Sequence, residues 1–349
     1  MVLRAELRIW SCGACLLACL AGCGSSDDAG DEPHDDALEP PADSLLSEPL
    51  GELPRWLSEV GLYRELPSLT AFSRALAYEP SYPLWSDGGT KQRFLVLPQG
   101  ASIDASAADY ELPLGSLLFK TFAYRTAESP KLPLPIETRL LRRVAEGWEL
   151  SAYGWNQAGT DAELLELKRP ELRAVLADDG SPIEHAIPSR LECRQCHESA
   201  SSAVLGFSEL QLAPAGELDR LAPHLDPPPG EARQALPEHG PRTSAVLGYF
   251  LGNCVHCHNG GNGAASSFDL RPEVALENLI DEPTASSATA AGIRVVPGEP
   301  EQSILYLALA GGSDVEVKDM PPLGVALRDA SALTLMREWI EALAEEDDP

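Results

Sequence analysis

The hydrophobic pattern of the chain changes character near residue 187. Before this point, short runs of aromatic and branched residues alternate with Gly, Pro and Asp, a pattern typical of β-strands. The runs cover residues 93–97, 116–124, 137–144 and 148–155. The last two flank Glu146-Gly147, where a tight turn would join them into a hairpin. We therefore predict an antiparallel β-rich domain over residues 53–186.

Beyond residue 187, apolar residues recur at helical spacing. The pattern predicts helices over 243–255, 300–310 and 329–345. The last of them carries an apolar stripe that consists of Leu333, Met336, Ile340 and Leu343. A proline-rich spacer at 226–230 precedes these helices. The chain as a whole is therefore expected to have an α+β fold, with the sheet first and the helices after it.

The first 22 residues have the pattern of an export signal. Arg4 and Arg8 precede an apolar stretch that is too short to span a membrane. The stretch ends in Leu20-Ala21-Gly22-Cys23, which resembles the bacterial lipobox, and this resemblance implies cleavage before Cys23 and its lipidation. An ordinary cleaved signal or a buried apolar start is the alternative. Residues 23–52 would then form an acidic, disordered tether.

This N-terminus predicts an exported lipoprotein that faces the periplasm and is attached to a membrane by its lipid anchor. By analogy with enteric lipoproteins, the absence of Asp directly after Cys23 favours the outer membrane over the inner one.

The charge of the chain narrows the range of partners. There are 54 acidic and 26 basic residues, which give a formal charge of −28. Such a surface repels a phosphate backbone, so nucleic acid is excluded as a partner. It attracts proteins with basic docking surfaces instead.

Two short motifs carry the chemistry. Cys193-Arg-Gln-Cys196-His197 and Cys254-Val-His-Cys257-His258 both have the form C-x-x-C-H, the covalent attachment signature of c-type haem. Two thiols at this spacing reach the two vinyl groups of one porphyrin, and the following imidazole is placed to bind the iron. The motifs predict two covalently bound haem c groups, with His197 and His258 as proximal iron ligands.

Two other interpretations of these cysteines stay open. Paired C-x-x-C motifs also form zinc sites, although 57 residues lie between Cys196 and Cys254, whereas zinc ribbons usually have 15–20. A pair of disulfides or redox dithiols would require a βαβ pattern, which the sequence does not have. Neither interpretation gives the two histidines a task, and after lipidation of Cys23 two haems would use all the remaining cysteines of the mature chain.

Met320 is the candidate distal ligand of the second haem. It lies in Lys318-Asp-Met-Pro-Pro-Leu-Gly324, where prolines stiffen the loop around the thioether. Met336 is the other methionine of the mature chain, and its place in an apolar stripe favours a core position.

The region from 243 to 345 resembles the short cytochrome c modules of secreted bacterial proteins. The resemblance rests on the second C-x-x-C-H, on Met320-Pro-Pro-Leu-Gly and on Trp339-Ile340 near the C-terminus. It implies that His258 and Met320 ligate one iron and that Phe250 contacts Trp339 where the first and last helices cross. The expected fold class is therefore α+β, with an N-terminal antiparallel β-rich domain followed by a mainly α-helical cytochrome c-like haem domain.

The wider chain resembles a family of exported dihaem c-type cytochromes. This resemblance starts at Tyr82-Pro-Leu-Trp-Ser-Asp-Gly and covers about 290 residues. Four residues of its first part are candidates for lining a site, although core and turn positions are favoured for them: Trp85, Asp87, Trp155 and Asn156.

The sixth ligand of the first haem stays open at this stage. His256, which the family shares, is one candidate; the others are His185, His224 and His239, or no ligand at all. An empty position would allow peroxide to bind.

The sequence therefore predicts a membrane-anchored dihaem c-type cytochrome that carries out single-electron transfer between redox proteins. A dihaem peroxidase-like oxidoreductase is the alternative, and a structural zinc or disulfide module is the third. The expected organisation is a signal peptide (1–22), a lipidated tether (23–52), a β-rich domain (53–186), a first haem-binding segment (187–242) and a cytochrome c-like domain with the second haem (243–349). An electron carrier is favoured over an enzyme.

Overall fold

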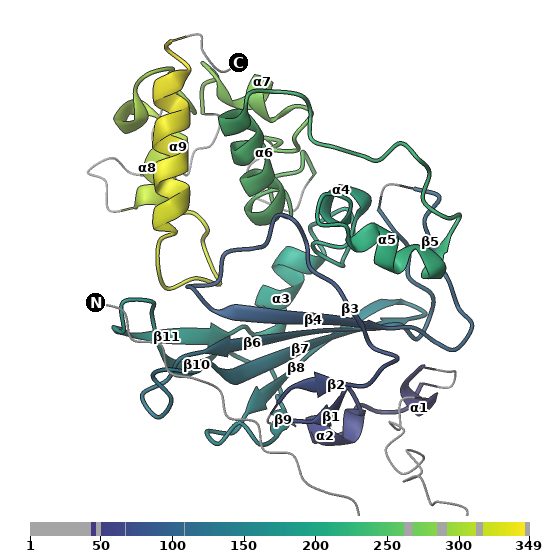
Figure 1. Cartoon of the computed structure of the whole chain (residues 1–349). Coiled ribbons are helices and arrows are strands. Elements are labelled where there is room, and N and C mark those ends of the chain that lie inside the picture. The colour runs from purple at the N-terminus through teal and green to yellow at the C-terminus, as the bar shows by residue number, and fades with distance from the viewer. Residues whose placement is uncertain are drawn as a thin grey trace, which may run out of the picture. The chain divides into compact units, whose positions relative to one another are not determined.

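A computed structural model describes residues 43–46, 50–66, 68–107, 109–261, 268–284, 292–311 and 317–345. Its largest element is a six-stranded antiparallel sheet with the strand order β3-β4-β6-β7-β8-β9. The strands are β3 (Leu76–Ala77), β4 (Thr90–Val96), β6 (Leu117–Tyr124), β7 (Leu134–Val144), β8 (Gly147–Trp155) and β9 (Ala162–Leu164). The four predicted strand runs lie in this sheet, so the prediction of an antiparallel sheet over this part of the chain is confirmed (Figure 1).

The predicted β7–β8 hairpin is present, with a small shift of its turn. Val144 pairs with Gly147, so the two-residue loop consists of Ala145 and Glu146 and lies one residue earlier than expected. Gly147 has a φ of 131°, a conformation that residues with a Cβ rarely adopt. The turn therefore ends at the glycine rather than centring on it.

Three small sheets accompany the large one. Two are antiparallel pairs and the third is a parallel pair that joins distant segments. Their strands are β1 (Tyr63–Glu65) with β2 (Thr70–Ala71), β10 (Glu171–Leu176) with β11 (Pro182–Ile187), and β5 (Ile103–Asp104) with β12 (Leu225–Asp226).

The helices of the described residues are mostly short. The N-terminal ones are α1 (Asp43–Leu46) and α2 (Leu57–Val60). The middle of the chain contains α3 (Arg190–His197), α4 (Glu209–Leu212), α5 (Glu217–Leu221) and the 3₁₀ turn η2 (Ala222–His224). The C-terminal ones are α6 (Pro241–Asn253), α7 (Ala275–Leu279), the 3₁₀ turn η3 (Pro300–Gln302), α8 (Ile304–Ala310) and α9 (Ala330–Ala342).

The expected fold class is wrong. Strand and bridge residues make up 26% and helices 24% of the described structure, which is mostly β-sheet, and no separate, mainly α-helical haem domain is evident in these residues. Isolated bridges, such as that between Ile280 and Val295, alternate with short helices after α6. The three predicted helices are present as α6, as η3 with α8, and as α9. The described residues between them form turns, isolated bridges and only the short α7, because the Gly and Pro of these segments favour turns, so helix does not dominate this region.

Both faces of the large sheet are covered. On one face, Phe119, Leu140 and Tyr153 pack against α2 and the segment that follows it. On the other face, Leu118 and Leu141 pack against residues 204–225, including Phe207. Each of these fully buried apolar side chains contributes about 1.5–3 kcal/mol to folding, so the segment between β11 and α6 is held firmly against the sheet.

A third cluster joins the C-terminal helices. Phe250 of α6 meets Trp339 of α9 edge to face, with ring centroids 6.4 Å apart, as the resemblance to cytochrome c modules implies. Trp339 also donates its indole N–H to Thr243 at 3.1 Å. Met336 is fully buried in the same cluster, which confirms its predicted core position.

A buried ion network lies on the sheet face that residues 204–225 cover. The Arg139 guanidinium donates two hydrogen bonds to the Glu137 carboxylate, at 2.6 and 3.0 Å, and the His185 ring nitrogen lies 2.9 Å from the same carboxylate. Burial alone would raise the pKa of Glu137, but Arg139 and His185 outweigh it and lower the pKa to about 2. Because the unfolded value is 4.5, Glu137 stabilises the fold above pH 4.5, and this contribution is lost as the pH falls towards 2.

We predict that Glu137→Gln lowers the free energy of unfolding at pH 7 by about 3 kcal/mol, because it leaves Arg139 buried without its partner. The loss of stability between pH 4.5 and 2 should also become shallower than in the unsubstituted chain. Denaturant unfolding followed by circular dichroism measures both effects. Glu149→Gln, which removes a partly exposed partner of Arg142, is the control, and an equal effect of the two substitutions would contradict the prediction.

Candidate functional site

The first C-x-x-C-H motif forms the helix α3. Ser189 caps the helix: its hydroxyl accepts the Glu192 N–H at 3.3 Å, while its own N–H donates to the Glu192 carboxylate at 2.8 Å. This capping box fixes where the helix begins. The Cys193 side chain packs against the apolar cluster between the large sheet and residues 204–225. The helix and its three motif residues are therefore anchored to the sheet.

His197 is held in one tautomer by a backbone carbonyl. Its Nδ1 lies 2.6 Å from the Ala203 oxygen, which can only accept, so Nδ1 carries the proton and Nε2 keeps a free electron pair. Burial lowers the pKa of His197 to about 4. The ring is thus neutral at pH 7, which is the state in which an imidazole binds a metal.

The second motif forms a turn directly after α6. The N–H groups of Cys257 and His258 both donate to the Cys254 carbonyl, at 3.0 and 2.9 Å. The Cys254 side chain packs against the cluster around Phe250 and Trp339. The His258 ring lies 4.5 Å from that of Phe268, centroid to centroid, and burial lowers its pKa to about 4. This imidazole is therefore also neutral at pH 7.

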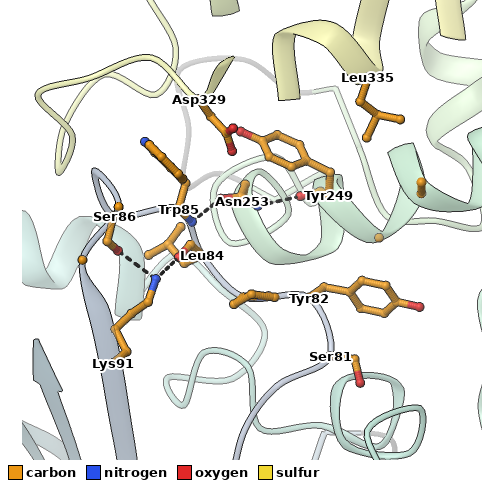
Figure 2. Close-up of a pocket in the computed structure, with 15 residues that line it drawn as sticks. Ser81, Tyr82, Leu84, Trp85, Ser86, Lys91, Tyr249, Asn253, Asp329 and Leu335 are labelled. Carbon is orange, nitrogen blue, oxygen red and sulfur yellow. Dashed lines mark hydrogen bonds between the residues drawn. The ribbon is translucent and has the colours of Figure 1, made fainter. Parts of the chain in front are cut away.

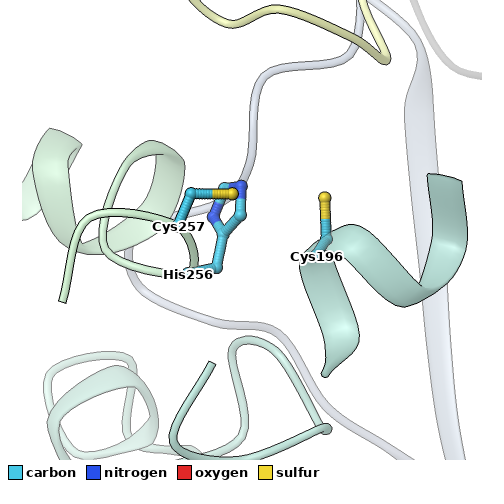
Figure 3. Close-up of side chains that lie close together, drawn as sticks. All are labelled: Cys196, His256 and Cys257. Carbon is cyan, nitrogen blue, oxygen red and sulfur yellow. The ribbon is translucent and has the colours of Figure 1, made fainter. Parts of the chain in front are cut away.

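The structure brings the two motifs together. The ligand atoms of Cys196, His256 and Cys257 all lie within 4.8 Å of one another (Figure 3). Asn259 strengthens the contact by donating its side-chain amide to the Ser199 carbonyl at 2.8 Å. Residues that are about 60 positions apart in the sequence thus share one site.

The cysteines of both motifs are present as thiols. The four cysteines of the two motifs are free, and none forms a disulfide. The Cys196 pKa is raised to about 12, first by its hydrogen bond with Cys257 and then by burial, so this thiol is protonated at neutral pH. The donor set fits both haem attachment, which needs two thiols and one neutral imidazole per motif, and a metal ion bound by sulfur and nitrogen.

Met320 lies in the loop between α8 and α9. Its N–H donates to the Ala308 carbonyl at 2.9 Å, and its own carbonyl accepts from Arg328 at 3.4 Å. The Met320 backbone is therefore held by one main-chain hydrogen bond and by one hydrogen bond from the Arg328 side chain. The structure describes the place of Met320, whereas Cys23 lies outside the described residues.

The other candidate residues have structural roles. The His185 ring is engaged with Glu137, which removes it as a free ligand. Trp155 is 4% exposed and donates its indole N–H to Thr138 at 2.9 Å, as a core residue does. Asn156 accepts the Thr160 N–H at 3.1 Å in a turn. The expectation of core and turn positions is confirmed for these two residues.

Asp87 has a role that the sequence pattern did not indicate. It is 3% exposed, and its carboxylate accepts the N–H groups of Ala326 and Leu327 at 3.0 and 2.8 Å. Trp85 reaches the same loop and donates its indole N–H to the Leu327 carbonyl at 3.2 Å. Because the partners lie about 240 residues away, no local signal could have identified this clamp on the Met320 loop.

A cavity of about 400 Å³ lies beside this clamp (Figure 2). The backbone N–H of Trp85 donates to the Asn253 side-chain oxygen at 2.7 Å. The Lys91 ammonium donates to the Ser86 hydroxyl at 3.2 Å and to the Leu84 carbonyl. Tyr82, Tyr249, Asp329 and Leu335 also line this space. The cavity therefore adjoins Asn253, the residue that precedes the second motif.

Comparisons with known proteins give no match from which a function could be assigned. No family model, no curated protein and no solved structure matches the chain. Among the described residues, no helix has both the length and the apolar character that a membrane crossing requires.

We predict that Asp87→Ala lowers the free energy of unfolding by about 2 kcal/mol, because the N–H groups of Ala326 and Leu327 lose their charged acceptor. Hydrogen exchange should accelerate over residues 320–328, since the clamp on this loop is gone. Asp161→Ala is the matched control, because Asp161 accepts the Ser58 N–H elsewhere in the chain. Faster exchange of 320–328 in both variants, or in neither, would contradict the role of the clamp.

Proposed function

We propose that this protein is a dihaem c-type cytochrome that transfers single electrons. The observation that carries the proposal is the meeting of two C-x-x-C-H segments, with Cys196, His256 and Cys257 within 4.8 Å. A zinc or disulfide module would leave His197 and His258 without a task, whereas haem attachment uses both motifs completely. The capped helix α3 and the turn after α6 hold the thiols of each motif on rigid elements.

When bound, haem c supplies a one-electron Fe(III)/Fe(II) couple. Cys193 and Cys196 would bind one group, and Cys254 and Cys257 the other. His197 and His258 would be the proximal ligands, and for His197 the bond from Nδ1 to Ala203 leaves Nε2 available. Met320 is the proposed distal ligand of the second haem, because its loop is stiffened by prolines and clamped by Asp87.

His256 is the proposed sixth ligand of the first haem. It belongs to the second motif in sequence, but its ring lies beside Cys196 of the first motif. His185 is engaged with Glu137, whereas the closeness of the His256 ring to Cys196 supports His256 directly. The second motif would thus contribute to both haems.

The N-terminal pattern extends the proposal to location. Lipidation of Cys23 would attach the protein to a membrane, facing the periplasm, with the outer membrane favoured. The formal charge of −28 would steer redox proteins with basic docking surfaces towards it.

A specific observation also favours a second candidate, a zinc module. Cys196, His256 and Cys257 offer two sulfur atoms and one nitrogen at close range. A closed structural zinc site needs four ligands, and this cluster provides three. We therefore place it second.

Haem and metal analysis of the purified full-length chain tests the two candidates. After expression in a host that matures c-type cytochromes, we expect two haems per polypeptide by pyridine haemochrome and no stoichiometric zinc. The double substitution Cys193→Ser with Cys196→Ser should leave one haem, and so should Cys254→Ser with Cys257→Ser. Stoichiometric zinc without haem, while a control cytochrome matures normally, would overturn the cytochrome proposal.

A further inference from the structure

Three positively charged side chains lie side by side on the face of the large sheet that residues 204–225 cover. Arg93 of β4 pairs with Lys120 of β6, which in turn pairs with Arg139 of β7. Directly paired residues point to the same face of a sheet, so the three form one row, which we term the cation row. The next row on this face is apolar and consists of Leu95, Leu118, Leu141 and Leu150.

The charges of the cation row are only partly compensated. Arg139 is bound to Glu137, as described above. Arg93 is 6% exposed, and neither its guanidinium nor the Lys120 ammonium forms a hydrogen bond or an ion pair with a described residue. The Lys120 ammonium lies 4.8 Å from the Phe122 ring centre. Burial, together with the neighbouring Arg93 and Arg139, lowers the pKa of Lys120 well below its usual range.

Such an arrangement is unfavourable unless an anion completes it. Like charges that are directly opposite one another destabilise a sheet, and a buried charge needs a partner. With all three cations protonated, Glu137 balances one of them, and two positive charges remain without an ion-pair partner among the described residues. Glu79 acts on Arg93 electrostatically, but it is exposed and forms no ion pair with Arg93. Two carboxylates would balance the row.

The cation row faces the first C-x-x-C-H motif. Helix α3 lies over this sheet (Figure 1). Its Cys193 packs with the apolar cluster that contains the row next to the cations. Lys120 and Arg139 are close enough to His197 to act on it electrostatically, as Arg139 is to Cys193. An anion bound by the row would therefore lie beside a group attached at this motif.

We propose that Arg93, Lys120 and Arg139 bind the propionate carboxylates of the haem attached to Cys193 and Cys196. This inference rests on the proposed function and gives the sheet a task in it. Arginine binds a carboxylate through two parallel hydrogen bonds, whereas lysine binds it as a point charge. Both kinds of interaction become stronger in a partly buried site. Two propionates carry the charge that the row lacks.

Potentiometric titration of the two-haem protein tests the assignment. Positive charge near the iron favours Fe(II), so Lys120→Gln and Arg93→Gln should each lower one midpoint potential and leave the other unchanged. Because removal of a cation raises the propionate pKa, the same potential should also become dependent on pH. Lys120→Arg, which keeps the charge, should behave as the unsubstituted protein.

Several other titratable groups surround the row and are present in every variant. They are Tyr78, Lys91, Tyr124, Glu137, His185, Cys193 and His197. A pH dependence that appears only when Arg93 or Lys120 is replaced is thus assigned to the propionates.

Arg142→Gln is the matched control. Arg142 lies on the same strand, β7, but pairs with Leu117 and bonds to Glu149 at 2.8 Å on the opposite face of the sheet. This variant loses an equally buried cation without touching the cation row, so both potentials should stay at their original values. Loss of the first haem alone in the Arg93 or Lys120 variants, with Arg142→Gln fully loaded, would also support the proposal.

Three results have different consequences. Potentials that respond to Arg93→Gln and Lys120→Gln no more than to Arg142→Gln would overturn the inference while the cytochrome proposal stands. A potential of the unsubstituted protein that changes with added phosphate would show that a dissolved anion occupies the row, which also overturns it. Absence of haem from the unsubstituted protein would contradict the proposed function itself.

Discussion

The site depends on a close approach between the segment 82–88 and helix α6. A Cβ at Gly248 would lie 2.3 Å from the Tyr82 ring, and one at Gly252 would lie 2.3 Å from the Tyr82 carbonyl, so only glycine allows this contact. Asp87 and Trp85 of the same segment bind the loop at Leu327. The C-terminal helices are thereby docked where the second motif meets the first.

This docking turns two separate sequence motifs into one site. Helix α3 is fixed to the sheet by its cap and by Cys193, and the turn after α6 is fixed by Cys254 in the cluster around Trp339. Cys196 and Cys257 are the second cysteines of their motifs, and their sulfur atoms lie within 4.8 Å of each other. Burial lowers the pKa of His197 and His258 and thereby keeps both imidazoles neutral. This is the form of imidazole that binds a metal.

Local patterns predicted the local features well. The strands, the β7–β8 hairpin, the core position of Met336 and the contact between Phe250 and Trp339 follow from spacing or from the family resemblance. The fold class was wrong although the three predicted helices are present, because the spacing of apolar residues does not show that the segments between these helices form turns and isolated bridges. The Asp87 clamp and the cation row depend on which strands pair and on contacts across about 240 residues, and neither can be seen along the sequence.

The central claim is that the two motifs form one dihaem unit, and electron paramagnetic resonance of the oxidised protein tests it most directly. The spectrum of the full-length chain is compared with the sum of the spectra from its two single-haem cysteine variants. Neighbouring irons interact magnetically, so the account predicts a spectrum that differs from this sum by broadening or splitting. A spectrum equal to the sum would show two isolated haems and would contradict the juxtaposition of Cys196, His256 and Cys257.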